Sequence, residues 1–453
     1  MMLVTGNNFV AGRRLIQKLS QHVEKESHNI TTYGHLSAFL DPLGIEQPVQ
    51  VTSEELPVVA SKFLNQPYGI ELGTVPPEER AWLVNRINQL DLSVEKEGIR
   101  EMAKLMIESE TFDAFMQKRF GQVKRYGLEG LESLVVAVSH LINLTKLDSS
   151  VVFGMAHRGR LNLLKGPLGM DPRAIFAKLK GKSEFASGSA DVLSHLGINH
   201  VHNQRRLIML PNSSHLEAVN PVQLRFIHGL KQADVLGVQI HGDGAMSGQG
   251  VVQESLQLSR IPGFEVGGVV HIVTNNQLGF TADKLRGRSG RYCTDVAHVI
   301  NSPVLHVNGD HPECVARMIA VAAEYRRAFR KDVFVDIVGF RKWGHNELDE
   351  PSFTQPQMYA RIRNRPLPGS VFASKHHSEE EIEAWRRHEF DALDSALKEC
   401  ESFTFPLPIT SEFEVQDTKS ESPSEAKLKE ICIKSVTLPQ GFVSIIFYLG
   451  CRM

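Results

Sequence analysis

The chain has 453 residues, a length that suggests two or three domains with ample core. Hydrophobic residues make up 42% and charged residues 23%, and with a formal net charge of -2 nothing indicates a nucleic-acid or acidic-membrane partner. The five cysteines are widely spaced and form no CxxC pair, which argues against a disulfide framework or a thiolate zinc site, and no apolar run reaches the roughly 18 residues of a membrane span.

The first 120 residues are predicted to be a mostly helical region. The segment 95–120, EKEGIREMAKLMIESETFDAFMQKRF, has apolar residues at helical spacing and few helix breakers. The segment 7–23, NNFVAGRRLIQKLSQHV, is basic and precedes the first acidic residue, Glu24. An ordinary amphipathic helix is the favoured interpretation of this segment, and a mitochondrial targeting peptide is the alternative.

Residues 121–365 are predicted to form an α/β domain, because short apolar runs alternate with helical patterns. The predicted strands are 149–156, 205–211, 234–241, 267–275, 302–309 and 332–340. Between the last two, residues 311–330 predict a helix with Pro312 in its first turn, where proline is tolerated. This alternation indicates a mostly parallel sheet covered by helices, whose ligands bind at the carboxyl ends of the strands.

The last part of the chain, residues 366–453, has a weaker pattern. Residues 378–400 predict a helix, with Ser378 and Glu381 as a possible capping box. The stretch HHSEEE at 376–381 is interpreted as a solvated helix start in preference to a metal site. Residues 411–430 are polar and are predicted to be a mobile linker.

A carboxylate flanked by glycines, HGDG, follows the predicted strand 234–241. Gly242 and Gly244 carry no Cβ, so backbone N–H groups beside Asp243 can closely approach an anion. The helix predicted from GQGVVQESLQLSRI, residues 248–261, would direct its positive end to the same place. A plain turn explains a lone GDG equally well, so the motif needs a second set of ligands to indicate a site.

The next predicted strand, 267–275, ends at Asn275 and is followed by Asn276 and Gln277. If the two strands are parallel and joined by a right-handed crossover, Asp243 and Asn276 converge at neighbouring strand ends. A carboxylate, an amide oxygen and a backbone carbonyl form an oxygen-only site that suits Mg²⁺ holding a diphosphate. GDG after a strand, then a helix, then a strand ending in two asparagines is the layout of the thiamine-diphosphate-binding motif.

Eight segments of the chain resemble the 2-oxoglutarate dehydrogenase family, specifically its thiamine-dependent, decarboxylating first component. They are RYGLEGLESL, GMAHRGRLN, SGSADVLSHLG, LPNSSHLEAVNPV, HGDGAMSGQGVVQE, TNNQLGFT, RGRSGRYCTD and FRKWGHNELDEP, and they occur in the family's order. The similarity begins near Tyr33 and continues more weakly to about Phe442. DVLSHL, NQLGFT and WGHNELDEP look closer to the 2-oxoadipate branch than to the 2-oxoglutarate branch.

The resemblance implies roles for particular residues. It assigns Mg²⁺ to Asp243, Asn276 and the backbone carbonyl of Leu278. It assigns the cofactor to Arg158, Gly242, Asp243, Gly244, Asn276 and Leu278. His157 and His195 match histidines that bind substrate carboxylates and move protons, and His215 and His345 fall in signature loops. An arginine suits diphosphate through forked, charge-assisted hydrogen bonds.

The resemblance also implies an activity and partners. Thiamine diphosphate with Mg²⁺ would decarboxylate a 2-oxo acid, 2-oxoadipate or 2-oxoglutarate, and the acyl group would pass to a lipoyl group of an acyltransferase. A homodimer and a location in the mitochondrial matrix are implied as well. A hydrolytic metal site in GHNELDE, with His345, Glu347, Asp349 and Glu350, is the disfavoured alternative because it lacks an HExxH-type histidine pair.

The chain departs from the family pattern in several places. Ser213 replaces a proline in NSSHLE, the connection before residue 234 looks short, and Gly244 stands where the family often has alanine. We find no counterpart of the family's second α/β domain, which supplies the glutamate that activates the cofactor, or of its C-terminal domain. The isolated chain is therefore expected to bind cofactor weakly and turn over little substrate. A non-catalytic form that docks on full-length subunits is the alternative.

Overall fold

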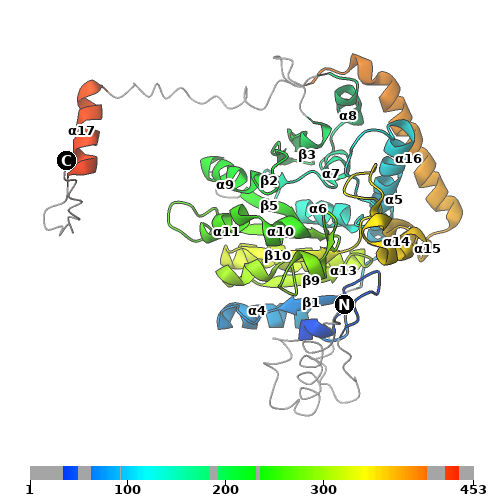
Figure 1. The fold of residues 1–453 in the computed structure, drawn as a ribbon, viewed down its shortest axis with the longest axis horizontal. Helices are drawn as coiled ribbons and strands as arrows, with labels where there is room; N and C mark the ends of the chain where they lie inside the picture. The colour runs from blue at the N-terminus through cyan, green and yellow to red at the C-terminus, as the bar shows by residue number, and fades with distance from the viewer. Residues whose placement is uncertain are drawn as a thin grey trace, which may run out of the picture. The chain divides into compact units, whose positions relative to one another are not determined.

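The computed structural model describes residues 34–48, 63–91, 93–182, 192–230, 235–405 and 424–437 (Figure 1). The basic segment 7–23 lies outside these residues. Contacts divide the chain into one compact unit that ends at Phe405 and a second unit from Pro406 to Met453. Among the described helices, none combines the length and the apolar character that a membrane span requires.

The first unit is built around an eight-stranded sheet in the order β1-β9-β10-β6-β5-β2-β4-β3. The strands are β1 (Tyr68–Glu71), β2 (Ser150–Met155), β3 (Ile198–His202), β4 (Arg205–Met209), β5 (Val235–Gly242), β6 (Val269–Asn275), β9 (Val304–Asn308) and β10 (Val333–Val338). The six inner strands run parallel, whereas β1 and β3 pair antiparallel at the two edges. The predicted α/β class and all six predicted strands are confirmed.

Helices cover both faces of this sheet, as a parallel sheet requires. Val151 and Phe153 of β2 belong to the largest apolar cluster, which includes residues of helices α6 and α13. Val152 between them packs instead with Val219 and Ile227 of helix α9. Because successive side chains of a strand point to opposite faces, each β2 residue is buried and the strand is almost continuously apolar.

The helices in the described part of the first unit vary widely in length. They are α4 (Pro77–Asn88), α5 (Lys96–Arg119), α6 (Ser133–Asn143), α7 (Arg160–Lys165), α8 (Pro172–Leu179), α9 (Val219–Leu230), α10 (Asp243–Gly248), α11 (Gly250–Gln257), α12 (Lys284–Gly287), α13 (Pro312–Phe329), α14 (Pro356–Arg363), α15 (Pro368–Ser374) and α16 (Glu379–Glu399). The helices predicted at 95–120, 311–330 and 378–400 are confirmed as α5, α13 and α16. Ser378 caps α16 by accepting the Glu381 N–H, while the Glu381 carboxylate pairs with Arg100 and His377.

The N-terminal region also contributes to the sheet, which the sequence pattern did not predict. β1 pairs with β9 in register, and α4 packs on α13. The domain boundaries at residues 120 and 365 stay predictions. In the second unit, α17 (Glu425–Val436) is capped by Ser424, so residues 425–430 are helical, whereas residues 411–423 of the predicted linker lie outside the described residues.

Candidate functional site

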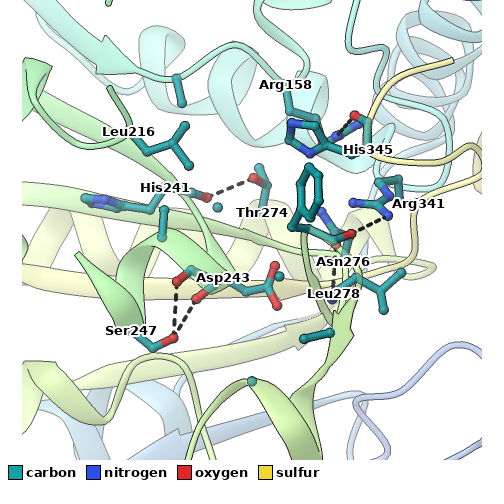
Figure 2. A pocket seen from close by; sticks show the side chains of 18 of the residues that line it. Arg158, Leu216, His241, Asp243, Ser247, Thr274, Asn276, Leu278, Arg341 and His345 are labelled. Atoms are coloured by element: carbon teal, nitrogen blue, oxygen red, sulfur yellow. Dashed lines mark hydrogen bonds between the residues drawn. The ribbon is translucent and has the colours of Figure 1, made fainter. Parts of the chain in front are cut away.

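A cavity of about 560 Å³ opens at the carboxyl ends of β2, β5 and β6 (Figure 2). Its wall includes His157 and Arg158 after β2, Asp243 after β5 and Asn276 after β6. The rest comes from a two-stranded hairpin, the residues around α12, and the loop after β10. The hairpin consists of β7 (Leu278–Gly279) and β8 (Ala282–Asp283). The cavity therefore lies where a parallel sheet of this kind presents its ligands.

Asp243 is placed by the abrupt change from strand to helix. β5 ends at Gly242, and Asp243 is the first residue of α10, with only 2% of its surface exposed. The following residue, Gly244, packs directly on the hairpin, because a Cβ built there would lie 2.7 Å from the Cα of Gly279. Two glycines in contact thus let the first turn of α10 approach the backbone next to Leu278.

Replacing Gly244 with alanine is expected to separate α10 from the hairpin and lower the free energy of unfolding by about 1–3 kcal/mol, the usual range for overpacking. The reason is that a backbone atom, not a flexible side-chain end, meets the new methyl group. Gly248→Ala in the same helix is the matched control, since a Cβ there meets no atom within 4 Å. Denaturant titration measures both variants, and equal stabilities would contradict the packing argument.

Asn276 reaches the same end of the sheet as Asp243. β5 and β6 are parallel neighbours with Gly242 opposite Thr274, and the Thr274 hydroxyl donates to the His241 carbonyl at 2.8 Å. The Asn276 Oδ1 accepts the Leu278 N–H at 3.2 Å. In Figure 2 the Asp243 side chain points toward the side of the cavity formed by Asn276 and Leu278. The structure brings together the three residues predicted as magnesium ligands.

The Asp243 carboxylate is suited to a hard cation. Its Oδ2 is buried and has no hydrogen-bond partner, and the nearest positive charge is the Arg288 guanidinium at 3.7 Å. Burial raises the pKa of Asp243 to about 6, although Arg288 opposes this shift. A buried, incompletely compensated carboxylate beside an amide oxygen and a backbone carbonyl is the donor set that Mg²⁺ prefers.

Positive charge dominates the remainder of the cavity wall. Five cationic side chains line it: Arg158, Lys284, Arg286, Arg288 and Arg341. The carboxylates in the wall are those of Asp243 and Asp283. Gly242 leaves space beside them, because a Cβ built there would meet no protein atom within 4 Å. This surplus of positive charge suits a polyanion such as a diphosphate.

Two predicted histidines meet at one side of the cavity. The rings of His157 and His345 lie 5.6 Å apart, and both contact Tyr126, at 4.1 and 5.6 Å between ring centroids. Burial and the nearby Arg158 lower the pKa of His157 to about 3 and that of His345 to about 4. Both rings are therefore neutral at pH 7.

Backbone contacts hold this histidine pair in place. Arg158 donates to the His345 carbonyl at 2.6 Å, which joins the loop after β2 to the loop after β10. The Glu347 carboxylate accepts the backbone N–H groups of Arg125 and Gly127, on either side of Tyr126. Burial lowers the pKa of Arg158 to about 10, so its guanidinium stays charged at neutral pH.

The other two predicted histidines lie outside the cavity wall. His195 is buried and its Nε2 lies 3.3 Å from the Ser214 hydroxyl, yet it is near enough to contribute to the lowered pKa of His157. His215 exposes its side chain to solvent, and its carbonyl accepts the Ser213 hydroxyl hydrogen. His195 therefore lies close to His157, and neither His195 nor His215 belongs to the cavity wall.

A fully buried arginine, Arg160, ties these loops together. Its guanidinium donates to three backbone carbonyls. They belong to Met155 at the end of β2, to Leu196 next to His195, and to Leu210 directly after β4. All three acceptors are backbone carbonyls, so the side chain links these loops to one another. Arg160, the second arginine of HRGR, does not line the cavity, whereas Arg158 does.

The carboxylates of GHNELDE, residues 344–350, bind groups of their own loop and of neighbouring segments. Glu347 binds two backbone N–H groups, Asp349 accepts the Asn346 N–H and amide, and Glu350 caps Ser352 and pairs with Arg363. In the described part of the chain, a group with metal-binding spacing occurs elsewhere, at Glu71, Asp295 and His298. The arrangement gives no support to a hydrolytic metal site in this loop.

The sequence pattern missed Arg288, Arg341 and Tyr126. All three lie in segments that resemble the family, but resemblance alone does not show which side chains of a loop face a cavity. Arg341 follows β10 and donates to the carbonyls of Phe280 and Trp343. Tyr126 has φ of 53°, a left-handed conformation that is uncommon for a non-glycine residue.

Comparison with known proteins identifies the family to which the chain is similar. The profile described as "Dehydrogenase E1 component" matches residues 103–408. The "Probable 2-oxoadipate dehydrogenase complex component E1 homolog" of Caenorhabditis elegans is 38% identical over 436 residues, 83% of this chain and 47% of that protein. The human "2-oxoadipate dehydrogenase complex component E1" is 42% identical over 343 residues, 69% of this chain and 37% of that protein. The "2-oxoglutarate dehydrogenase E1 component" of Rickettsia felis is 36% identical over 374 residues, 77% and 38% respectively. The chain spans less than half the length of these relatives.

Proposed function

The chain belongs to the dehydrogenase E1 component family, and from this premise we propose that its cavity binds thiamine diphosphate with Mg²⁺ and serves the decarboxylation of a 2-oxo acid. The observation that carries the proposal is the buried Asp243 carboxylate, with one oxygen lacking a hydrogen bond, in a wall rich in arginine. When bound, the cofactor supplies an electron sink for the loss of carbon dioxide.

The residues present fit this group at its charged end. Asp243, the Asn276 amide oxygen and the Leu278 carbonyl would hold Mg²⁺, since hard oxygen donors suit this ion. Arg158 would bind the diphosphate, since a guanidinium matches phosphate oxygens in charge and geometry. Gly242 would let the anion approach the backbone, because it leaves open the space that a side chain would fill.

The histidine side of the cavity is proposed to receive the substrate. Neutral His157 and His345 would accept protons at a ring nitrogen, and a bound carboxylate would favour their charged forms. Arg341 would attract the substrate's negative charge from the same wall. The names of the relatives mention 2-oxoadipate and 2-oxoglutarate, both dicarboxylic 2-oxo acids, and we propose 2-oxoadipate as the preferred substrate.

We further propose that the acyl product passes to the lipoyl group of an acyltransferase, that the protein acts as a homodimer, and that it resides in the mitochondrial matrix. The relatives' names support the first proposal, because they describe components of a dehydrogenase complex. Sedimentation would test the second proposal and organelle fractionation the third.

Isothermal titration of this chain with thiamine diphosphate tests the central proposal. Binding is expected in the presence of Mg²⁺ and should disappear when the metal is removed with EDTA, because phosphate oxygens and Asp243 share the ion. Binding of equal strength with and without metal would exclude the proposed site. Carbon dioxide release from 2-oxoadipate and 2-oxoglutarate then compares the substrates, and rapid release would contradict the sequence-based expectation of low turnover.

A further inference from the structure

We propose that Arg288 makes binding of the metal depend on the diphosphate. In this mechanism the guanidinium acts as a competing cation beside Asp243 when the cavity holds no anion. When Mg²⁺ and diphosphate enter together, the guanidinium turns to the phosphate oxygens and leaves the carboxylate to the metal. The inference rests on the proposed function, because it assigns the diphosphate of that same site a second arginine.

The contact between Arg288 and Asp243 is close but incomplete. Arg288 exposes 9% of its side chain, and its Nη1 lies 3.7 Å from the Asp243 Oδ2, beyond hydrogen-bonding distance. The Nε of Arg288 and the Oδ2 of Asp243 are both buried without a hydrogen-bond partner. The pair is held by charge alone, so each member keeps the capacity to bind an additional ligand of opposite charge.

The other cations of the cavity wall are occupied by the protein itself. Arg158 donates to the His345 carbonyl, and Arg341 donates to two carbonyls. Arg286 pairs with Asp283, and Lys284 pairs with Glu46. Arg288 differs from these four, since its contact with the proposed metal ligand is not a hydrogen bond. An entering anion can therefore reorient Arg288 without breaking a hydrogen bond to the protein.

The ligand that satisfies both residues at once is a metal–polyphosphate. A free cation would meet Asp243 but would be repelled by Arg288 at short range. A free diphosphate would meet Arg288 but would be repelled by Asp243. A metal bound to diphosphate presents positive charge to the carboxylate and negative charge to the guanidinium, so both repulsions become attractions. The pair thus selects the complex over either component.

This mechanism predicts two effects of opposite sign when the charge of Arg288 is removed. The affinity for Mn²⁺ alone, measured by electron paramagnetic resonance of the free ion, should rise about tenfold in Arg288→Gln because a competing cation is lost. The affinity for thiamine diphosphate with saturating Mg²⁺ should fall about tenfold because a phosphate contact is lost. Inorganic pyrophosphate with Mg²⁺ should behave like the cofactor.

Three further variants complete the design. Arg288→Lys keeps the charge and should leave the Mn²⁺ affinity near that of the wild type. Arg291→Gln removes a charge from the same loop, but Arg291 pairs with Glu46 and does not line the cavity, so both affinities should stay within about twofold. Arg288→Met should reproduce Arg288→Gln and checks the effect in a second neutral side chain.

The outcomes separate this inference from the proposed function. Unchanged or weaker Mn²⁺ binding in both neutral variants would overturn the role of Arg288, even if the wild type binds the cofactor. Failure of the wild type to bind thiamine diphosphate with Mg²⁺ would instead refute the proposed function. Removing one partner of a buried ion pair can destabilise the fold, so circular dichroism checks that each variant folds. If the neutral variants do not fold, the wild type decides: Mn²⁺ should bind more tightly with inorganic pyrophosphate present, and equal Mn²⁺ affinity with and without pyrophosphate would contradict the proposal.

Discussion

Asp243→Asn is expected to weaken the Mg²⁺-dependent binding of thiamine diphosphate by about 100-fold or more, since a direct metal ligand loses its charge. The shape of the side chain is kept, and the amide oxygen is a poorer ligand than a carboxylate. Arg288 would then lie beside a neutral amide, so its ion pair with residue 243 would also be lost. Isothermal titration with and without Mg²⁺ measures the change.

Asp283→Asn is the matched control for this experiment. Asp283 lines the same cavity and makes the same change of charge, but its Oδ1 caps α12 by accepting two backbone N–H groups, which an amide oxygen also accepts. Its cofactor affinity should stay within about threefold of the wild type. Equal losses in the two variants would show that the charge of the cavity as a whole, and not one ligand position, governs binding.

His306→Gln is expected to produce the largest loss of stability, about 3 kcal/mol at pH 6. His306 is fully buried on β9, with its Nδ1 2.8 Å from Asp336 on β10 and its Nε2 2.9 Å from Glu71 on β1. One imidazolium therefore contacts two buried carboxylates and joins three strands. Glutamine would remove the positive charge beside Asp336, whereas Glu71 would keep His298 at 2.7 Å.

The pH dependence of this loss follows from the sign of the shift. Burial lowers the pKa of His306, but hydrogen bonds to Asp336 and Glu71 outweigh it and raise the pKa to about 9, from 6.5. The stabilisation is thus complete below pH 6.5 and disappears as the pH rises through 9. Denaturant titrations of wild type and variant should differ most near pH 6 and converge above pH 9, with exposed His228→Gln as control. A difference that grows with pH would refute the argument.

The inner strands were predictable because burial on both faces leaves an unmistakable pattern. The run VVFGM in β2 and the run VVHIVTN in β6 are apolar or β-branched over nearly their whole length. The edge strands were missed for other reasons. β1 is buried, but its four residues, YGIE, are too few to show a pattern. β3, INHVH, has three half-buried polar residues, and its Val201 is exposed, so it differs little from a loop in sequence.

The sequence predicted the site residues whose positions are set by the sheet, and it missed those whose positions are set by the loops. Asp243 and Asn276 follow parallel neighbouring strands, so their meeting depends only on the order of the sheet. The position of His195 depends on Arg160, which links segments far apart in the chain. Arg288 depends on the course of the loop after α12, for which no local pattern exists.

α17 shows how a polar helix escapes sequence analysis. Its described side chains are mostly exposed, and residues 425–430 contain only Ala426 and Leu428 as apolar residues, too few to show a helical stripe. Ion pairs one turn apart, Lys429 with Glu425 and Lys434 with Glu430, accompany the Ser424 cap. Such exposed pairs stabilise a helix only slightly, and a polar composition predicted a linker instead.

The contact between Gly244 and Gly279 makes two distant positions interdependent in evolution. A methyl group at residue 244 would lie 2.7 Å from the facing Cα, whereas one at residue 279 would lie 3.4 Å from its partner. An alanine at the first position would require the hairpin to withdraw, and a side chain at the second position would then meet less resistance. Substitutions at these two sites should therefore covary, and the harm from one should be rescued by changes along the hairpin.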